Sequence, residues 1–299
     1  MNIFESLHPA FEDLVDLNST LELLKAGFQF TEGPVWHAQE NCLYFSDIPA
    51  DTLYRYSSAK GVEVVYHPSG FSNGLTLDHA GNLIVCEHHT RAITTYKNGQ
   101  KQILADHYQG KKLNSPNDLV LSKNGVLYFT DPIYGLRAGN GGPAIQELSF
   151  QGLFSYRQGW SEPHLERSDL ERPNGVALSY DQSTLYAIDT VKQHVRQFTI
   201  TEKGNVSGGQ VIMELWGAGD ARPDGLKLDR DGNFFVTGPE GIWVFREDHT
   251  LLGKIHFAQK TANLAWGDED RKTLYITSSQ YLFRLRMKTS GWSPLDSYS

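Results

Sequence analysis

The chain has 299 residues, of which 27 are Lys or Arg and 35 are Asp or Glu, so its formal net charge is −8. Apolar residues make up 39% and aromatic residues 12%, a composition typical of a globular protein with a large core, which excludes a disordered chain. The longest basic run is Lys111-Lys112, which excludes an electrostatic surface for nucleic acid or for an anionic membrane and favours a small-molecule partner.

Residues 1–20 are predicted to form an N-terminal arm with one helical turn around residues 12–17. They contain no basic stretch followed by an apolar core, so no secretory signal is predicted. No uncharged run reaches the roughly 18 residues of a membrane span, and a cytoplasmic location is expected. Cys42 and Cys86 lie in apolar, strand-like runs, where buried free thiols are expected rather than a disulfide.

One pattern then recurs six times along the chain. Each copy opens with an amide or an acid, usually followed by Gly, and continues with a short apolar run, a turn and a second strand. The copies begin at Glu32, Asn73, Asn117, Asn174, Asp224 and Asn263. Their spacing of about 40 to 57 residues is close to the length of a propeller blade, and the longest interval contains an insertion.

The second strand of each copy follows a turn rich in Asp, Asn, Gly and Lys, which supply the hydrogen bonds and positive φ angles of hairpins. These strands are predicted at residues 43–46, 83–86, 127–130, 185–188, 234–237 and 274–277. Six such meanders predict an all-β fold, a six-bladed β-propeller with four-stranded blades that forms one domain over residues 21–299. Either residues 21–30 or the tail after Leu285 is expected to supply the outer strand that closes the ring.

The first strand of each blade lines the central channel, so the six residues that open the copies are expected to form a ring at one end of it. Every member has a side-chain oxygen and none has sulfur or imidazole, which suits a hard cation such as Ca²⁺. A second layer of carboxylates is expected beside the ring, and its mutual repulsion also favours a cation: Asp47, Glu87, Asp131 and Asp189. Asn or Asp before Gly is an ordinary turn element, but its recurrence in all the copies favours the ring.

Four segments make a resemblance specific, at residues 31–36, 114–118, 172–176 and 222–226. They read Thr-Glu-Gly-Pro-Val-Trp, Asn-Ser-Pro-Asn-Asp, Arg-Pro-Asn-Gly-Val and Arg-Pro-Asp-Gly-Leu. From about Phe28 to Arg286, the chain resembles the gluconolactonase/senescence-marker-protein family of calcium-dependent lactonase propellers. Ser115 stands where the sugar-lactonase branch has arginine, and residues 86–89 and 131–136 resemble the bacterial gluconolactonase-like branch instead.

The resemblance implies that Glu32, Asn174 and Asp224 bind one divalent cation, Ca²⁺ first, with Zn²⁺, Mg²⁺ and Mn²⁺ as alternatives. It also implies that Asn117 contacts substrate or metal-bound water. The predicted function is hydrolysis of a sugar lactone to the aldonic acid, with the cation polarising the carbonyl and activating water. Asp224 is the predicted general base and later proton donor.

Other residues of the same end of the channel are candidates for substrate contact: Asn73, His88 and Tyr134. Asp118 is a rival general base, but its side chain is expected to point away from Asn117 across the strand. The insertion at residues 137–146 contains three glycines and is predicted to be a mobile loop that could act as a lid.

Alternative functions stay open on the same scaffold. A phosphotriesterase-type hydrolase would use a similar set of ligands, and a non-catalytic propeller would bind a ligand or a protein on one face. A serine esterase is disfavoured, because Gly70-Phe71-Ser72-Asn73-Gly74 matches the nucleophile elbow in letters but is followed by a strand and a turn instead of a helix. No hydrophobic helix or zipper pattern indicates a dimer, so the oligomeric state is left open.

Overall fold

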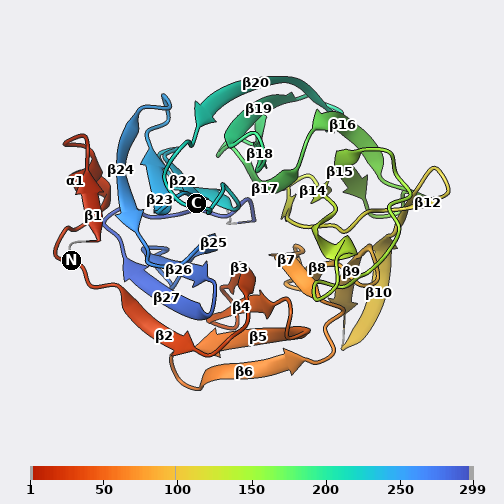
Figure 1. Ribbon diagram of the computed structural model, residues 1–299, viewed down its shortest axis with the longest axis horizontal. Helices are drawn as coiled ribbons and strands as arrows, with labels where there is room; N and C mark the ends of the chain where they lie inside the picture. Colours follow the sequence, from red (N-terminus) through yellow and green to blue (C-terminus); the bar gives the residue numbers. More distant parts are fainter. Residues whose placement is uncertain (1–2, 98, 296–299) are drawn as a thin grey trace.

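Six antiparallel sheets are arranged in a ring around one central channel, which confirms the six-bladed β-propeller (Figure 1). The computed structural model describes residues 3–97 and 99–295. Within each blade, consecutive strands pair in chain order from the axis outward. All the predicted second strands lie inside the second strand of a blade.

Blade 1 consists of β3 (Thr31–His37), β4 (Cys42–Asp47), β5 (Thr52–Ser57) and β6 (Gly61–Tyr66), and blade 2 of β7 (Ser72–Leu77), β8 (Leu83–Glu87), β9 (Ala92–Lys97) and β10 (Gln100–Ala105). Blade 3 consists of β13 (Leu119–Leu121), β14 (Val126–Asp131), β15 (Gln151–Arg157) and β16 (His164–Leu170), and blade 4 of β17 (Pro173–Leu178), β18 (Thr184–Asp189), β19 (His194–Ile200) and β20 (Val206–Glu214). A small hairpin of β11 (His107–Tyr108) and β12 (Lys111–Lys112) precedes blade 3.

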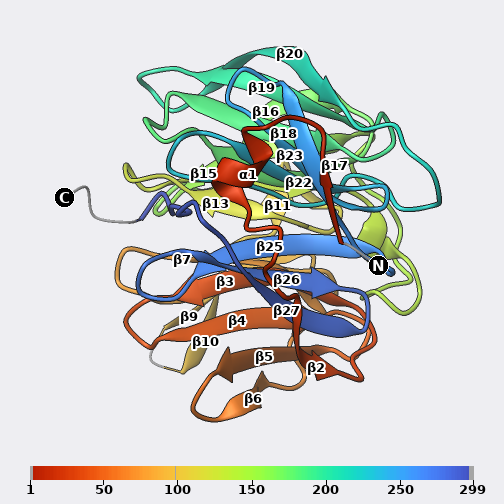
Figure 2. The ribbon, with the colours of Figure 1, turned by 90° about the vertical axis from the view of Figure 1, so that its left-hand side faces the viewer.

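Blade 5 consists of β21 (Leu226–Leu228), β22 (Phe234–Gly238), β23 (Gly241–Phe245) and β24 (Leu251–His256), with β1 (Phe4–Ser6) added outside β24. Blade 6 consists of β25 (Thr261–Gly267), β26 (Thr273–Ser278), β27 (Tyr281–Arg286) and β2 (Glu22–Ala26). The outer strand that closes the ring therefore comes from the N-terminal side, the first of the two expected sources. Figure 2 shows β2 running beside β27.

The core lies between neighbouring blades, because each blade packs both faces against another sheet. Every residue of β4 is buried, whereas the outer strand β6 of the same blade is largely half-buried. Aromatic pairs connect adjacent blades, including Tyr186 with Phe234 at 4.9 Å and Phe235 with Trp266 at 5.0 Å between ring centroids. Both cysteines are buried and free, as predicted. Neither helical element of the described residues is long and apolar enough to cross a membrane.

The N-terminal arm packs on the propeller. Its helix α1 (Phe11–Leu14) is shorter than the predicted turn and begins before it, because the chain returns to an extended conformation at Val15. Strand β1, which was not predicted, pairs with β24, and Phe11 is fully buried where a side chain on Gly253 would collide with its ring. The arm thus covers the outer edge of blade 5.

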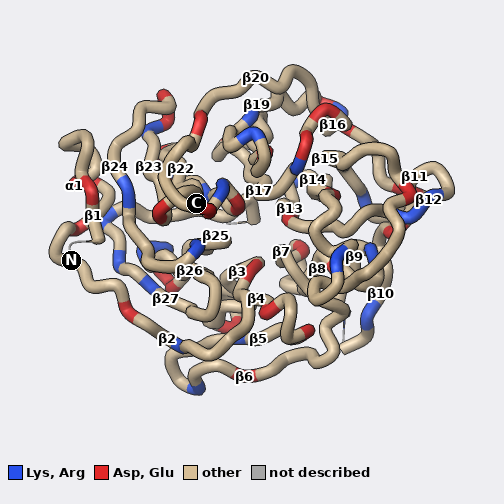
Figure 3. Tube along the Cα trace, in the orientation of Figure 1, with Lys and Arg blue, Asp and Glu red and all other residues tan. Residues whose placement is uncertain are grey.

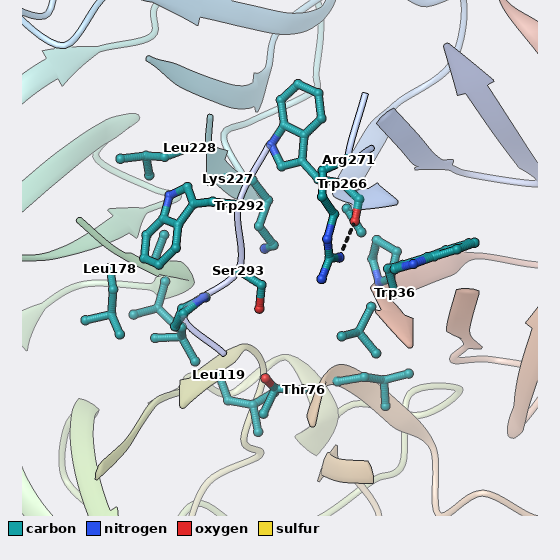
Figure 4. A pocket seen from close by; sticks show the side chains of 18 residues that line it. Trp36, Thr76, Leu119, Leu178, Lys227, Leu228, Trp266, Arg271, Trp292 and Ser293 are labelled. Carbon is teal, nitrogen blue, oxygen red and sulfur yellow. Dashed lines mark hydrogen bonds between the residues drawn. The ribbon is translucent and has the colours of Figure 1, made fainter. Parts of the chain in front are cut away.

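The C-terminal segment covers the far end of the channel. Gly291 forms a β-bridge with Asp229, and the chain continues past Trp292 over a cavity of about 90 Å³ between the inner strands (Figure 4). Indole rings and aliphatic side chains line this cavity, and Lys227 and Arg271 extend into it. Lys227 donates to the side-chain oxygen of Asn263, the ring residue of blade 6, at 3.4 Å. It reaches Asn263 from the end of the channel that Trp292 covers.

Replacement of Phe11 by Ala should lower the free energy of unfolding by about 3 to 5 kcal/mol, because it leaves a large cavity in a packed core. The matched control is Leu7→Ala, since Leu7 in the same arm is 52% exposed and its truncation should cost no more than about 0.5 kcal/mol. Urea unfolding measures both. Equal stability of the Phe11 variant and the wild type would show that the arm does not fold with the propeller.

Candidate functional site

A cavity of about 330 Å³ opens where the inner strands begin, at the opposite end of the channel from Trp292. Acidic positions lie close to the axis there, beside β3, β7 and β13 (Figure 3). The cavity is lined by Phe30, Glu32, Ile48, Pro49, Asn73, His88, Asn117, Tyr134, Asn140, Asn174, Asp224 and Lys260. It therefore brings together all seven residues predicted for the site, from five blades.

A bulge at the start of the inner strands turns the ring residues toward the axis. The register of β3, β7 and β17 against the second strand shifts around the ring residue and the glycine that follows it, and the register of β25 shifts just before Asn263. In two blades, the glycine after the ring residue donates its N–H to the backbone carbonyl of the ring residue in the next blade. Gly74 donates to Asn117 and Gly175 donates to Asp224, both at 2.8 Å. A Cβ at either glycine would lie 2.4 Å from that oxygen, so the sequence needs Gly there.

Glu32 and Asp224 form a pair of buried carboxylates at the axis. Burial raises the pKa of Glu32 to about 8, and the negative charges of Asp224 and Asp118 add to this effect. Its carboxylate accepts hydrogen bonds from the backbone N–H of Gly33 and, at 3.1 Å, from the amide of Asn263. Glu32 therefore keeps its proton at neutral pH unless a positive charge lies beside it.

Asn174 completes the predicted set of metal ligands. Its side-chain amide nitrogen donates to the Thr190 hydroxyl at 3.0 Å, and its side-chain carbonyl oxygen accepts no hydrogen bond from the described part of the chain. The cavity therefore receives three oxygen donors, two from carboxylates and one from an amide, a set that fits a hard cation. No cluster of three His, Cys, Asp or Glu residues placed to hold a metal occurs in the described residues, and here the amide takes the place of the third such ligand.

His88 connects the ring to the insertion after β14. Its Nδ1 lies 3.0 Å from the Asn140 carbonyl and its Nε2 lies 3.1 Å from the amide nitrogen of Asn73. The carbonyl can only accept, so we assign the proton to Nδ1, and Nε2 accepts from Asn73. Neutral His88 thereby orients Asn73. The loop predicted as a lid forms a wall of the cavity, because His89 also contacts the Gly141 carbonyl at 2.9 Å.

Asn117 and Tyr134 line the same cavity from blade 3. Tyr134 begins the short helix η1 (Tyr134–Leu136), and the Arg172 guanidinium lies 5.1 Å from the centre of its ring. Ser115 holds this turn, since its hydroxyl donates to the Pro132 carbonyl at 2.5 Å and accepts from the N–H of Gly135 at 2.9 Å. Ser115 therefore serves the local fold at the position where the other branch of the family has arginine.

Asp118, which was expected to point away from Asn117, is absent from the cavity lining, whereas Asn117 is part of it. Asp118 is buried, its charge acts on Glu32, and one of its oxygens lies 3.5 Å from the amide nitrogen of Asn263. Strand β13 begins only at Leu119, so simple alternation does not hold at Asn117 and Asp118, which both face Thr130 across a bulge. Asn263 lies beneath the cavity and bridges the buried acids.

The second layer of carboxylates is also used differently from the prediction. Asp47, Asp131 and Asp189 each accept two consecutive backbone N–H groups of the loop before the first strand, those of residues 29 and 30, 114 and 115, and 171 and 172. Glu87 pairs with Lys101 at 2.6 Å instead. These acids have local partners and need no cation, so they hold the loops that carry the site.

Lys260 is the functional candidate that sequence reasoning missed. Its ammonium lies 2.8 Å from a carboxylate oxygen of Asp224, inside the cavity lining, and 5.2 Å from the centre of the Phe30 ring. Lys260 comes three residues before Asn263, and this position is Gln29, Gly70, Asn114, Glu171 or Ala221 in the other copies. The repeat carries no signal at that position, although its place before an inner strand puts it at the mouth of the channel.

His88 should make stability depend on pH. Burial lowers its pKa to about 4, whereas the unfolded chain binds the proton near pH 6.5. Because the unfolded state is protonated first as the pH falls, the free energy of unfolding should decrease between about pH 6.5 and 4, by up to about 3 kcal/mol. Urea unfolding in chelator at pH 7 and pH 4.5 measures this loss, which should shrink in His88→Gln and persist in His79→Gln, an exposed control. An unchanged loss in His88→Gln would contradict the assignment.

Comparisons with known proteins agree with this geometry. Residues 30–280 match the family model described as SMP-30/Gluconolactonase/LRE-like region. A gluconolactonase of Zymomonas mobilis is 33% identical over 95% of this chain and 85% of its own length, and a 6-deoxy-6-sulfogluconolactonase of Pseudomonas putida is 25% identical over 88% of each. The solved structure of a gluconolactonase from Xanthomonas campestris superimposes with a TM-score of 0.89 at 30% identity, over 95% of this chain and 94% of that one. The chain belongs to the SMP-30/gluconolactonase/LRE-like family.

Proposed function

We propose that this protein is a metal-dependent hydrolase that opens a sugar lactone to its aldonic acid. The observation that carries the proposal is the convergence of Glu32, Asn174 and Asp224 on one cavity large enough for a small molecule. Relatives whose names specify gluconolactone, sulfogluconolactone and pentonolactone hydrolysis support the substrate class.

In the proposed site, Glu32, Asn174 and Asp224 hold one divalent cation. Three hard oxygen donors favour Ca²⁺, and Mg²⁺, Mn²⁺ or Zn²⁺ would use the same residues. When bound, the cation polarises the lactone carbonyl and lowers the pKa of a water molecule. It also compensates the buried negative charges of Glu32, Asp118 and Asp224.

Asp224 is the proposed general base. It is a carboxylate on the cavity wall, and it takes a proton from water as the water oxygen bonds to the carbonyl carbon. The bond from that carbon to the ring oxygen then breaks, and the proton passes from Asp224 to the ring oxygen, which becomes a hydroxyl. The product is a hydroxy acid.

The other residues position the substrate. Asn73, oriented by His88, and Asn117 offer amide groups to ring hydroxyls, and Tyr134 presents an aromatic wall on which a sugar ring can pack. His88 is proposed as a support of the wall and of Asn73. Asn140 and Gly141 close that side against bulk water through their contacts with His88 and His89.

Removal of the metal should abolish activity reversibly. Acid release from glucono-1,5-lactone at near-neutral pH should fall to the uncatalysed rate after chelation and return when Ca²⁺ is restored. Full activity in chelator would contradict the metal-dependent mechanism. If no condition exceeds the uncatalysed rate while a phosphotriester is cleaved, the site has the other hydrolytic function considered for this scaffold.

Replacement of Asp224 by Asn should lower kcat by about 10² to 10⁴-fold, because the group that acts first as base and then as acid is lost.

Replacement of Glu32 by Gln should instead weaken the binding of Ca²⁺. The loss should exceed the about 10 to 100-fold that is typical of residues that only support a metal ligand. Calorimetric titration with Ca²⁺ and initial rates at saturating Ca²⁺ separate the two effects. Asp220→Asn is the control, since Asp220 is an exposed acid a few residues from Asp224. An Asp224→Asn enzyme with unchanged kcat would exclude Asp224 as the base.

A further inference from the structure

One positive charge, Lys260, lies in the lining of the proposed active site, and a second, Arg172, lies against the lining residue Tyr134; hydrolysis of a neutral sugar lactone requires neither of them. We infer that the site selects lactones bearing an anionic group, with Lys260 and Arg172 as the residues that determine this specificity. The inference rests on the proposed function and extends it from a sugar lactone to a chemical class of sugar lactone.

Lys260 projects into the cavity from a fixed backbone. The hydroxyls of Ser278 and Ser279 donate to its carbonyl at 3.2 and 3.0 Å, which hold the chain just before β25. The side chain passes the Phe30 ring and is 40% exposed, so the ammonium can reach both Asp224 and a bound molecule. The Lys260 side chain thus ends in the cavity lining, where a bound molecule can contact it.

Arg172 lies on the other side of Tyr134. Its guanidinium packs over the Tyr134 ring, and its Nε is buried without a hydrogen-bond partner among the described residues. The carboxylate beside it in the sequence, Glu171, pairs with Lys192 at 2.8 Å. Arg172 forms no ion pair with a carboxylate in the described part of the chain. It is not itself part of the cavity lining, but its guanidinium lies against the ring of Tyr134, which is.

Lys260 and Arg172 belong to one electrostatic environment. Burial raises the pKa of Tyr134, the charge of Asp224 adds to the rise, and the charges of Lys260 and Arg172 both oppose it. Tyr134 itself lines the cavity. Lys260 thus lines the space in which the sugar would lie, and Arg172 lies behind the Tyr134 ring that forms part of its wall.

The charge balance favours an anionic ligand once the cation is in place. A divalent cation would balance two of the three buried carboxylates, Glu32, Asp118 and Asp224, and Asp224 as its ligand would attract the Lys260 ammonium less strongly. The ammonium in the lining and the guanidinium behind Tyr134 then outnumber the one carboxylate charge that is left. A phosphate or carboxylate group on the substrate would accept charge-assisted hydrogen bonds from both, and a neutral lactone would leave them unpaired.

The test compares glucono-1,5-lactone with two anionic lactones, its 6-phosphate and glucaro-1,4-lactone. We expect the Ca²⁺-loaded enzyme to prefer at least one anionic lactone by about tenfold or more in kcat/KM, the amount that a hydrogen bond between charged groups supplies. Lys260→Met and Arg172→Met should each reduce that preference about tenfold, mainly through KM. Lys192→Met is the matched control, because Lys192 is an exposed lysine paired with Glu171 outside the cavity lining.

Product binding gives a second measurement that needs no turnover. Calorimetric titration should show that 6-phosphogluconate or glucarate binds at least about tenfold more tightly than gluconate, and that Lys260→Met removes the difference. The phosphate and carboxylate arms distinguish which anion is recognised. Binding without this difference would overturn the inference even if the protein hydrolyses no lactone.

Two kinetic outcomes would also overturn the inference and leave the proposed function intact. In the first, glucono-1,5-lactone is hydrolysed efficiently and neither anionic lactone is preferred. In the second, Lys260→Met lowers kcat/KM equally for neutral and anionic lactones, which would show that Lys260 assists the reaction itself. Equal losses of preference in Lys260→Met and Lys192→Met would indicate general attraction by surface charge, a third contradicting result.

Discussion

At the start of the inner strands, backbone hydrogen bonds join the blades and place the functional side chains at the same time. The N–H of Gly175 donates to the Asp224 carbonyl, and the Thr130 hydroxyl donates to the Asn174 carbonyl at 2.7 Å. The preceding blade thus holds the backbone carbonyl of four ring residues and leaves their side chains for the channel: Asn73, Asn117, Asn174 and Asp224. Closure of blade 6 by β2 completes this arrangement, because Asp224 and Glu32 approach one another only in a closed ring.

Buried carboxylates have two different roles in this fold. Asp47, Asp131 and Asp189 are buried carboxylates that each accept two backbone N–H groups of the loops they hold, and at Asp131 these hydrogen bonds offset part of the rise in pKa that burial causes. Glu32 and Asp224 are equally buried but lie close to each other, with Asp118 beneath them. The proposed cation would compensate the charges of that second set.

The propeller fold and the common site could be predicted from the sequence because the residues that produce them recur in each copy of the repeat. The ring residue, the glycine that must approach the next blade and the apolar second strand recur together, so six copies predict six blades and a common site. Single events have no such support. Strand β1, the pairing of β2 with β27 and the position of Lys260 occur once each, and nothing in the other copies predicts them. The contacts of Asp118 with Asn263 and Glu32 could not be predicted either, because the backbone pairing of Asn117 and Asp118 with Thr130 does not follow the simple alternation of a strand. The metal, the role of Asp224 as base and the substrate contacts stay predictions.

The central claim is that Glu32, Asn174 and Asp224 jointly hold one divalent cation. Diffraction from crystals grown with Mn²⁺ and, separately, with Ca²⁺ tests it most directly, because the anomalous signal locates the ion independently of activity. The account predicts one site on the channel axis, with oxygens of all three residues at about 2.3 to 2.6 Å from Ca²⁺. An ion bound elsewhere, or a cavity in which the Lys260 ammonium still neutralises Asp224 at saturating Ca²⁺ with no ion beside it, would contradict it.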